Sequence, residues 1–225
     1  MEWTKRFRKA LTFSYDDGSE QDIRLVALLN RCGMKCTFNL NSGLGPGDVW
    51  EYKGCPVRRL DLPACREVYA GHEIAVHGAR HLAPSSLEPE ALHQELAGDK
   101  ARLTEIFGTA PVGMAYAYGD CNAAVTEKAR SLGLRYGRGV WENHSFDPQA
   151  DLLAFRPTCH HDDAQLDALV TRFLASEPET PQIFYIWGHS YEFDGNHNWD
   201  AFERVLDRLA GHDDIFYGTN REVLL

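Results

Sequence analysis

Hydrophobic and polar positions along the chain follow two patterns that alternate with each other. Short apolar runs bounded by turn residues predict strands, and apolar residues that recur every three to four positions predict helices. The predicted strands span residues 10–15, 35–40, 73–77, 112–118, 134–140, 182–187 and 215–217. The predicted helices span residues 19–33, 62–70, 89–107, 122–132, 163–175 and 200–210, and residues 42–56 are expected to form a long loop.

This regular alternation indicates the fold class. About seven strand–helix units in succession predict a parallel sheet with helices outside it, either doubly wound or closed as a barrel. Ser19 with Asp22, and Asp200 with Glu203, have the spacing of capping boxes at helix starts. No internal repeat, low-complexity tract or linker interrupts the pattern, so we expect residues 1–225 to form a single domain.

Composition and charge narrow the class of protein. Among 225 residues, 33 Asp and Glu outnumber 23 Lys and Arg, so the formal net charge is −10. A chain this acidic repels the phosphates of nucleic acid, which is therefore not an expected partner. No apolar run approaches the roughly 20 residues of a membrane span, and no secretory signal is evident, so we expect a cytoplasmic protein that binds no membrane. The six cysteines lack paired spacing and are expected to be reduced thiols.

Polar side chains follow four of the predicted strands at the point where each strand ends. In (β/α) barrels the reacting groups lie at these carboxyl ends. The positions are Asp16 and Asp17, His77 with His81, Tyr118 with Gly119, and His189.

Two of these groups have the chemistry of a metal site. Asp16 and Asp17 are adjacent carboxylates, which are hard to ionise together unless a cation lies between them; an ordinary turn before a helix is the alternative. His77 and His81 are four residues apart, and one turn of helix would place both imidazoles on one side. Together with Asp17 they would form a face of two histidines and one carboxylate, which suits hydrolytic zinc and non-haem iron equally.

At this point the sequence resembles the polysaccharide deacetylases, the NodB-homology enzymes of carbohydrate esterase family four. The resemblance covers about residues 12–190 and depends on the order of the motifs described above. It implies a distorted (β/α) barrel of about seven parallel strands with outer helices, and metal-dependent removal of acetyl groups from sugars. It further implies the following roles: Asp16 as general base, Asp17, His77 and His81 as ligands of a divalent metal, the Tyr118 backbone N–H as donor to the oxyanion, and His189 as general acid. Zn²⁺ is the expected metal, with Co²⁺, Ni²⁺ or Mn²⁺ as alternatives.

The sequence also departs from the family pattern. Ala115 stands where the family has the arginine that holds the base carboxylate, and Arg138 or Arg156 could supply that charge from elsewhere. Gly78 replaces a hydroxyl residue beside His77, and no Asp-Trp pair is evident around Trp141. These departures concern the pairing of the base more than the binding of metal.

Aromatic residues near His189 are candidates for sugar binding, because aromatic faces stack on the C–H surfaces of sugars, although plain core packing is an equal alternative. The candidate substrate-binding residues are Trp187, Tyr191, Trp141 and Arg138. Glu192 or Asp194 could orient His189. His160 and His161 could form a second metal site, but an acidic helix entry explains this segment adequately, so both are left out of the predicted ligand set.

We therefore expect a metal-dependent hydrolase that acts on the N-acetyl, or alternatively O-acetyl, groups of a soluble sugar or oligosaccharide. Three alternatives remain open from the sequence: a hydrolase of a non-sugar amide on the same scaffold, a metal- or glycan-binding protein that has lost turnover, and, least favoured, a non-haem oxygenase. The sequence does not indicate the oligomeric state.

Overall fold

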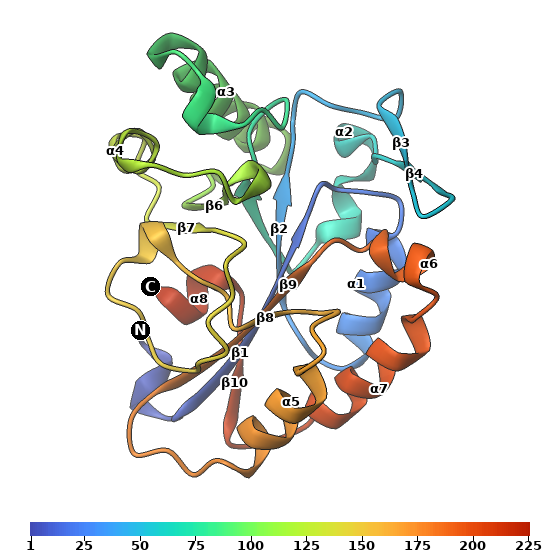
Figure 1. Cartoon of the computed structure of the whole chain (residues 1–225), viewed down its shortest axis with the longest axis vertical. Helices are drawn as coiled ribbons and strands as arrows, with labels where there is room; N and C mark the ends of the chain where they lie inside the picture. The colour runs from blue at the N-terminus through green and yellow to red at the C-terminus, as the bar shows by residue number, and fades with distance from the viewer.

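Parallel strands form one curled sheet at the centre of the molecule (Figure 1). The computed structural model describes all residues from 1 to 225. Seven strands lie in the order β7-β6-β5-β2-β1-β9-β8, and β10 pairs with the beginning of β1. Their bounds are β1 Lys9–Asp16, β2 Cys36–Leu40, β5 Glu73–Val76, β6 Gly113–Ala115, β7 Tyr136–Arg138, β8 Cys159–His160, β9 Gln182–Gly188 and β10 Ile215–Tyr217.

Helices surround this sheet, as Figure 1 shows. Their bounds are α1 Asp22–Arg31, α2 Leu62–Cys65, α3 Pro89–Phe107, α4 Ala123–Ser131, α5 Leu166–Ala175, α6 Glu192–Asn196, α7 Trp199–Leu209 and α8 Asn220–Leu224. The predicted distorted (β/α) barrel is confirmed. None of the helices combines the length and apolar character that crossing a membrane requires.

The central strand β1 shows why these residues form this fold. All eight of its residues are buried, because neighbouring strands flank it and side chains cover both of its faces. Such strands are expected to be almost continuously apolar. Asp16, which ends β1, is a buried charged residue that needs partners, and these partners belong to the site described below.

Several local predictions are wrong. Residues 49–58, expected to lie in a loop, form the antiparallel hairpin of β3 (Val49–Tyr52) and β4 (Cys55–Arg58). Neither predicted capping box forms: helix α1 begins after Gln21, because the Ser19 hydroxyl instead lies 2.9 Å from that of Ser190, and α7 begins at Trp199. The capping box that does form, between Thr219 and Glu222, opens α8, which was not predicted. The short elements β8 and α6 were not predicted either.

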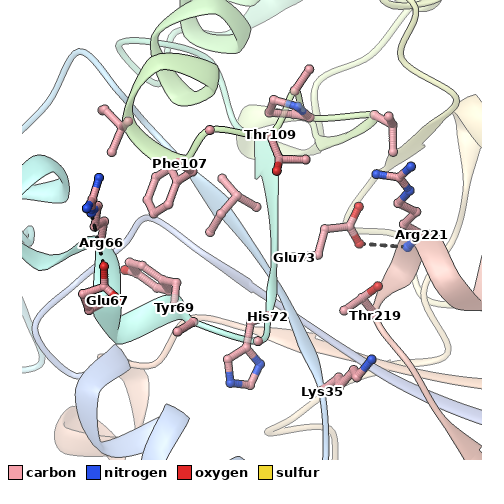
Figure 2. A pocket seen from close by; sticks show the side chains of 18 of the residues that line it. Lys35, Arg66, Glu67, Tyr69, His72, Glu73, Phe107, Thr109, Thr219 and Arg221 are labelled. Atoms are coloured by element: carbon pink, nitrogen blue, oxygen red, sulfur yellow. Dashed lines mark hydrogen bonds and ion pairs between the residues drawn. The ribbon is translucent and has the colours of Figure 1, made fainter.

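A pocket of about 730 Å³ lies at the end of the sheet where the strands begin. Figure 2 shows His72 and Glu73, at the start of β5, among its lining residues, together with Lys35, Thr109 and Arg221. The Glu73 carboxylate accepts the backbone N–H of Arg221 at 2.8 Å. None of the predicted site residues lines this pocket, and the amino ends of barrel strands are associated with stability rather than catalysis.

Candidate metal and catalytic site

Three side chains meet at the carboxyl end of the sheet in the arrangement of a metal site. Asp17 follows β1, and His77 and His81 follow β5. The Asp17 Oδ1 atom lies 3.7 Å from His81 Nε2 and 4.0 Å from His77 Nε2, and one ligand atom from each residue lies within 4.8 Å of the other two. A single cation could therefore contact all three side chains.

The hydrogen bond of His77 and the burial of His81 suit metal binding. The Nδ1 atom of His77 lies 2.8 Å from the carbonyl oxygen of Ala115. A proton on Nδ1 makes this hydrogen bond and leaves the Nε2 lone pair facing Asp17, as is usual for metal-binding histidines. Burial lowers the pKa of His81 to about 4, so its imidazole is neutral near pH 7. The three residues thus offer one carboxylate oxygen and two imidazole nitrogens, a donor set that fits a divalent metal such as zinc.

The segment that carries the two histidines is a loop, and the prediction that one turn of helix aligns them is wrong. Gly78 and His81 have positive φ values of 82° and 56°, which a right-handed helix excludes. Two carboxylates of α3 hold the loop instead. Asp99 accepts the backbone N–H of His77 at 3.0 Å, and Glu95 accepts that of Arg80 at 2.9 Å.

Asp16 is paired with Arg138, which ends β7. Arg138 Nη2 donates to Asp16 Oδ1 at 2.6 Å, and Asn39 Nδ2 donates to the same oxygen at 2.8 Å. Burial opposes ionisation of the Asp16 carboxyl, but the charge of Arg138, together with that of His189, outweighs it and lowers the pKa of Asp16 to about 2. Asp16 is therefore a carboxylate at any physiological pH and can accept a proton.

This pair accounts for the arginine that is missing at Ala115. Ala115 on β6 and Arg138 on β7 are register partners on neighbouring strands, so the guanidinium comes from one strand further along the sheet. Arg156, the other candidate, is exposed and binds the backbone carbonyls of Trp141 and Glu142 instead.

His189 faces Asp16 from the end of β9. His189 Nε2 lies 4.0 Å from Asp16 Oδ2, while its Nδ1 lies 3.3 Å from Glu192 Oε2. Burial lowers the pKa of His189, but Glu192 and the two aspartates outweigh this effect and raise it to about 9. The imidazole is therefore protonated near pH 7 and can donate a proton from Nε2.

Tyr118 borders the site beside His81. Its φ of 59° places it in the left-handed region, which is rare for a residue with a large side chain and indicates a constrained turn. The ring of Tyr118 packs against that of His81 with centroids 4.5 Å apart, and 66% of the residue is exposed. Its backbone thus follows β6 directly beside a candidate metal ligand.

The four candidate substrate-binding residues lie in different environments. Arg138 is 1% exposed and packs over the ring of Trp187, which is 7% exposed, so neither offers much surface to a sugar. Tyr191 is also largely buried, with its ring 5.1 Å from that of His189. Trp141 is 72% exposed and lines an open groove of about 510 Å³ that Gly119 also lines.

Residues of the unpredicted hairpin and its flank complete the site. Arg59 Nη2 donates to Asp17 Oδ1 at 3.1 Å, and its guanidinium packs over the ring of Trp50 at 4.5 Å. The Trp50 ring in turn meets Tyr191 edge-on at 5.3 Å. No local motif indicated these residues, because the contacts join segments far apart in the sequence.

Comparison with known proteins identifies the family. Residues 4–137 match the family described as polysaccharide deacetylase, which confirms the resemblance found in the sequence. No curated protein matches the chain.

Solved structures share the fold. A family 4 carbohydrate esterase from Streptomyces lividans, in complex with acetate, is 19% identical with a TM-score of 0.61, over 95% of this chain and 92% of that chain. The Xyl-CE4 domain of a xylanase from the hindgut metagenome of Trinervitermes trinervoides is 15% identical with a TM-score of 0.63, over 96% and 89%. The peptidoglycan deacetylase PdaC from Bacillus subtilis is 14% identical with a TM-score of 0.59, over 96% and 90%.

Proposed function

Because the chain belongs to the polysaccharide deacetylase family, we propose that it is a metal-dependent hydrolase that removes acetyl groups from a carbohydrate. One observation carries this proposal: beside the Asp17, His77 and His81 cluster, Asp16 and His189 face each other at 4.0 Å with opposite protonation. An ionised carboxylate and a protonated imidazole in one site are the base and the acid that amide or ester hydrolysis requires.

Asp17, His77 and His81 would hold the metal, and zinc is the best match to their nitrogen and oxygen donors. When bound, a divalent cation lowers the pKa of water and polarises the acetyl carbonyl. Arg59 donates to Asp17 at 3.1 Å and orients its carboxylate.

The chain's own residues move the protons. Asp16, held by Arg138 and Asn39, accepts a proton from the water that attacks the acetyl carbon. The backbone N–H of Tyr118 would donate to the oxyanion that forms, and one such donor is typically worth about 3–4 kcal/mol. The bond from carbon to the sugar nitrogen or oxygen then breaks, and His189 gives its proton to the departing atom while acetate is released.

The substrate would approach over the exposed aromatic residues. Tyr118 and Trp141 are the two most exposed large apolar side chains of the protein, and Trp141 lines the groove beside Gly119. Aromatic faces of this kind can stack on a sugar ring. Tyr191 would contribute through its ring, which lies 5.1 Å from that of His189, whereas Arg138, packed over the ring of Trp187, would support the site without touching the sugar.

Acetate release from N-acetylated chito-oligosaccharides and from O-acetylated xylo-oligosaccharides, with and without a chelator, tests the proposal. Release that the chelator abolishes and added Zn²⁺ restores supports it. Absence of release from any acetylated sugar, together with hydrolysis of a non-sugar amide, would replace the substrate class. The alanine at position 115 would favour the alternative of a protein without turnover, but the guanidinium that Arg138 brings to Asp16 argues against it.

A further inference from the structure

Behind His189, a cluster of three histidines surrounds one carboxylate oxygen. Glu192 Oε2 lies 3.0 Å from His160 Nε2, 3.3 Å from His189 Nδ1 and 3.5 Å from His161 Nε2. The same oxygen accepts the backbone N–H of His189 at 3.0 Å. A single atom thus connects the end of β8, where His160 lies, to the residue that follows β9.

His160, His161 and Glu192 are close enough to hold a metal, but their hydrogen bonds favour a different role. The backbone N–H of Asp162 donates to His160 Nδ1 at 3.1 Å. A neutral imidazole whose Nδ1 accepts carries its proton on Nε2, so His160 offers Glu192 an N–H instead of a lone pair. Neither ring nitrogen of His161 makes a hydrogen bond, and His189 Nδ1 contacts Glu192 at 3.3 Å as an ion pair without hydrogen-bond geometry. In contrast, the corresponding bond of His77 leaves Nε2 free for a metal.

We propose that His160 is a positioning residue for proton donation by His189: the Nε2–H of His160 holds Glu192, and Glu192 forms an ion pair with Nδ1 of His189. The Nε2 atom of His189 is thereby kept toward Asp16 and the leaving group. The role of His160 in catalysis rests on the proposed deacetylation. Which ring nitrogen of His160 donates and which accepts does not depend on that function.

His160 is itself well anchored for this role. Its backbone N–H donates to Glu142 Oε1 at 3.1 Å, and Trp187 Nε1 donates to the same oxygen at 3.3 Å. The His160 ring meets the Trp187 ring edge-on, with centroids 4.8 Å apart. A glutamate side chain has three rotatable bonds, so a second fixed donor reduces the number of orientations in which it can hold the acid.

Replacing His160 by phenylalanine and by glutamine tests the inference. Phenylalanine keeps the packing on Trp187 but removes the donor, and kcat is expected to fall about 10–100-fold with little change in KM, the size usual for such supporting contacts. Glutamine, whose amide N–H can reach the position of Nε2, is expected to restore most of kcat. His93→Phe on α3 is the matched control and should leave kcat unchanged. Equal losses in both His160 variants, or an effect on KM alone, would overturn the inference.

Two further measurements separate this inference from the proposed function. Metal analysis should give one equivalent per chain in wild type and in His160→Phe, and loss of a second equivalent in the variant would show a metal site instead. ¹⁵N NMR of the wild-type imidazoles should show the proton of neutral His160 on Nε2, and a proton on Nδ1 would overturn the inference. This measurement needs no substrate, so it decides the orientation even if no acetylated sugar is hydrolysed.

Discussion

Arg138 and Asp16 form a buried ion pair although three strands, β6, β5 and β2, separate β7 from β1 in the sheet. Arg138 Nη2 lies 2.6 Å from Asp16 Oδ1, a contact that a flat sheet would not allow. The curl of the sheet therefore determines the charge of the candidate base, because it brings the guanidinium to the carboxylate.

Arg138→Ala is expected to reduce acetate release most strongly at low pH. Arg138 lowers the pKa of Asp16 to about 2, so without it this pKa rises and the acidic limb of the pH–rate profile moves to higher pH. The variant should also unfold more readily, because loss of one partner of a buried pair typically costs about 3–5 kcal/mol. Urea denaturation and a pH–rate profile measure both effects.

Ala115→Arg in the Arg138→Ala background tests whether the positive charge beside Asp16 can come from β6 instead of β7. Because Ala115 and Arg138 are register partners, an arginine at 115 can approach Asp16 from the neighbouring strand. We expect the double variant to regain part of the lost acidic-side activity. Arg156→Ala, which removes an exposed arginine, is the control and should match wild type.

Asp16→Asn is expected to retain the metal but lose turnover. The amide keeps the size of the side chain but cannot accept a proton from water, and loss of a general base typically costs about 10²–10⁴-fold in rate. Asp17, His77 and His81 remain in place, so metal content should stay at the wild-type value. Acetate release and elemental analysis of the same preparation check both statements. Wild-type activity in this variant would exclude Asp16 as the base.

The fold was predictable because its signals are local and repeated. Apolar residues recur at the spacing of a strand in β1 and at the spacing of a helix in α3. The structure bounds α3 at the predicted residues, from Pro89 to Phe107. Hairpin β3–β4 was missed because its strands span only four residues each and are largely exposed, so no buried face produces an apolar run. Capping patterns failed where a tertiary contact took the side chain, as Ser190 does with Ser19.

The candidate site was predictable only in part, because some of its contacts join segments that are far apart in the sequence. The ends of the strands placed Asp16, Asp17 and His189 at one edge of the sheet, because parallel strands all end there. The partners of these residues could not be ranked from the sequence. Arg138 was one of two arginines considered, and Arg59 was not considered at all, since its contact with Asp17 depends on how the hairpin segment returns to the sheet.

His77→Ala is expected to abolish metal binding and, with it, acetate release. The substitution removes one of two imidazoles from a site with three protein ligands, and its Nε2 faces the remaining carboxylate. His72→Ala is the matched control, since His72 lines the pocket at the opposite end of the sheet (Figure 2) and should affect neither property. Elemental analysis after dialysis gives the metal content. Full metal content in His77→Ala would place the ligands elsewhere.

Asp99→Ala is expected to weaken metal binding without removing a ligand. Asp99 accepts the backbone N–H groups of His77 and Ser42, so its loss frees the loop that orients the histidine. Loss of such a supporting contact typically lowers metal affinity about 10–100-fold. Competition with a chromogenic chelator measures this affinity. An unchanged affinity would show that Glu95 and Asn41 suffice to hold the loop.

Glu192→Gln is expected to move the alkaline limb of the pH–rate profile to lower pH. His189 must be protonated to donate, so activity should fall as the pH rises through its pKa, which is about 9 in the wild type. The charge of Glu192 raises that pKa, and a neutral amide of the same size removes the charge while keeping a hydrogen-bonding oxygen. Loss of a neighbouring carboxylate typically lowers such a pKa by about 1–3 units. The profile of kcat against pH measures the shift, and Glu203→Gln, on the exposed surface of α7, is the control. If the alkaline limb stays in place in Glu192→Gln, this limb reflects the titration of a group other than His189.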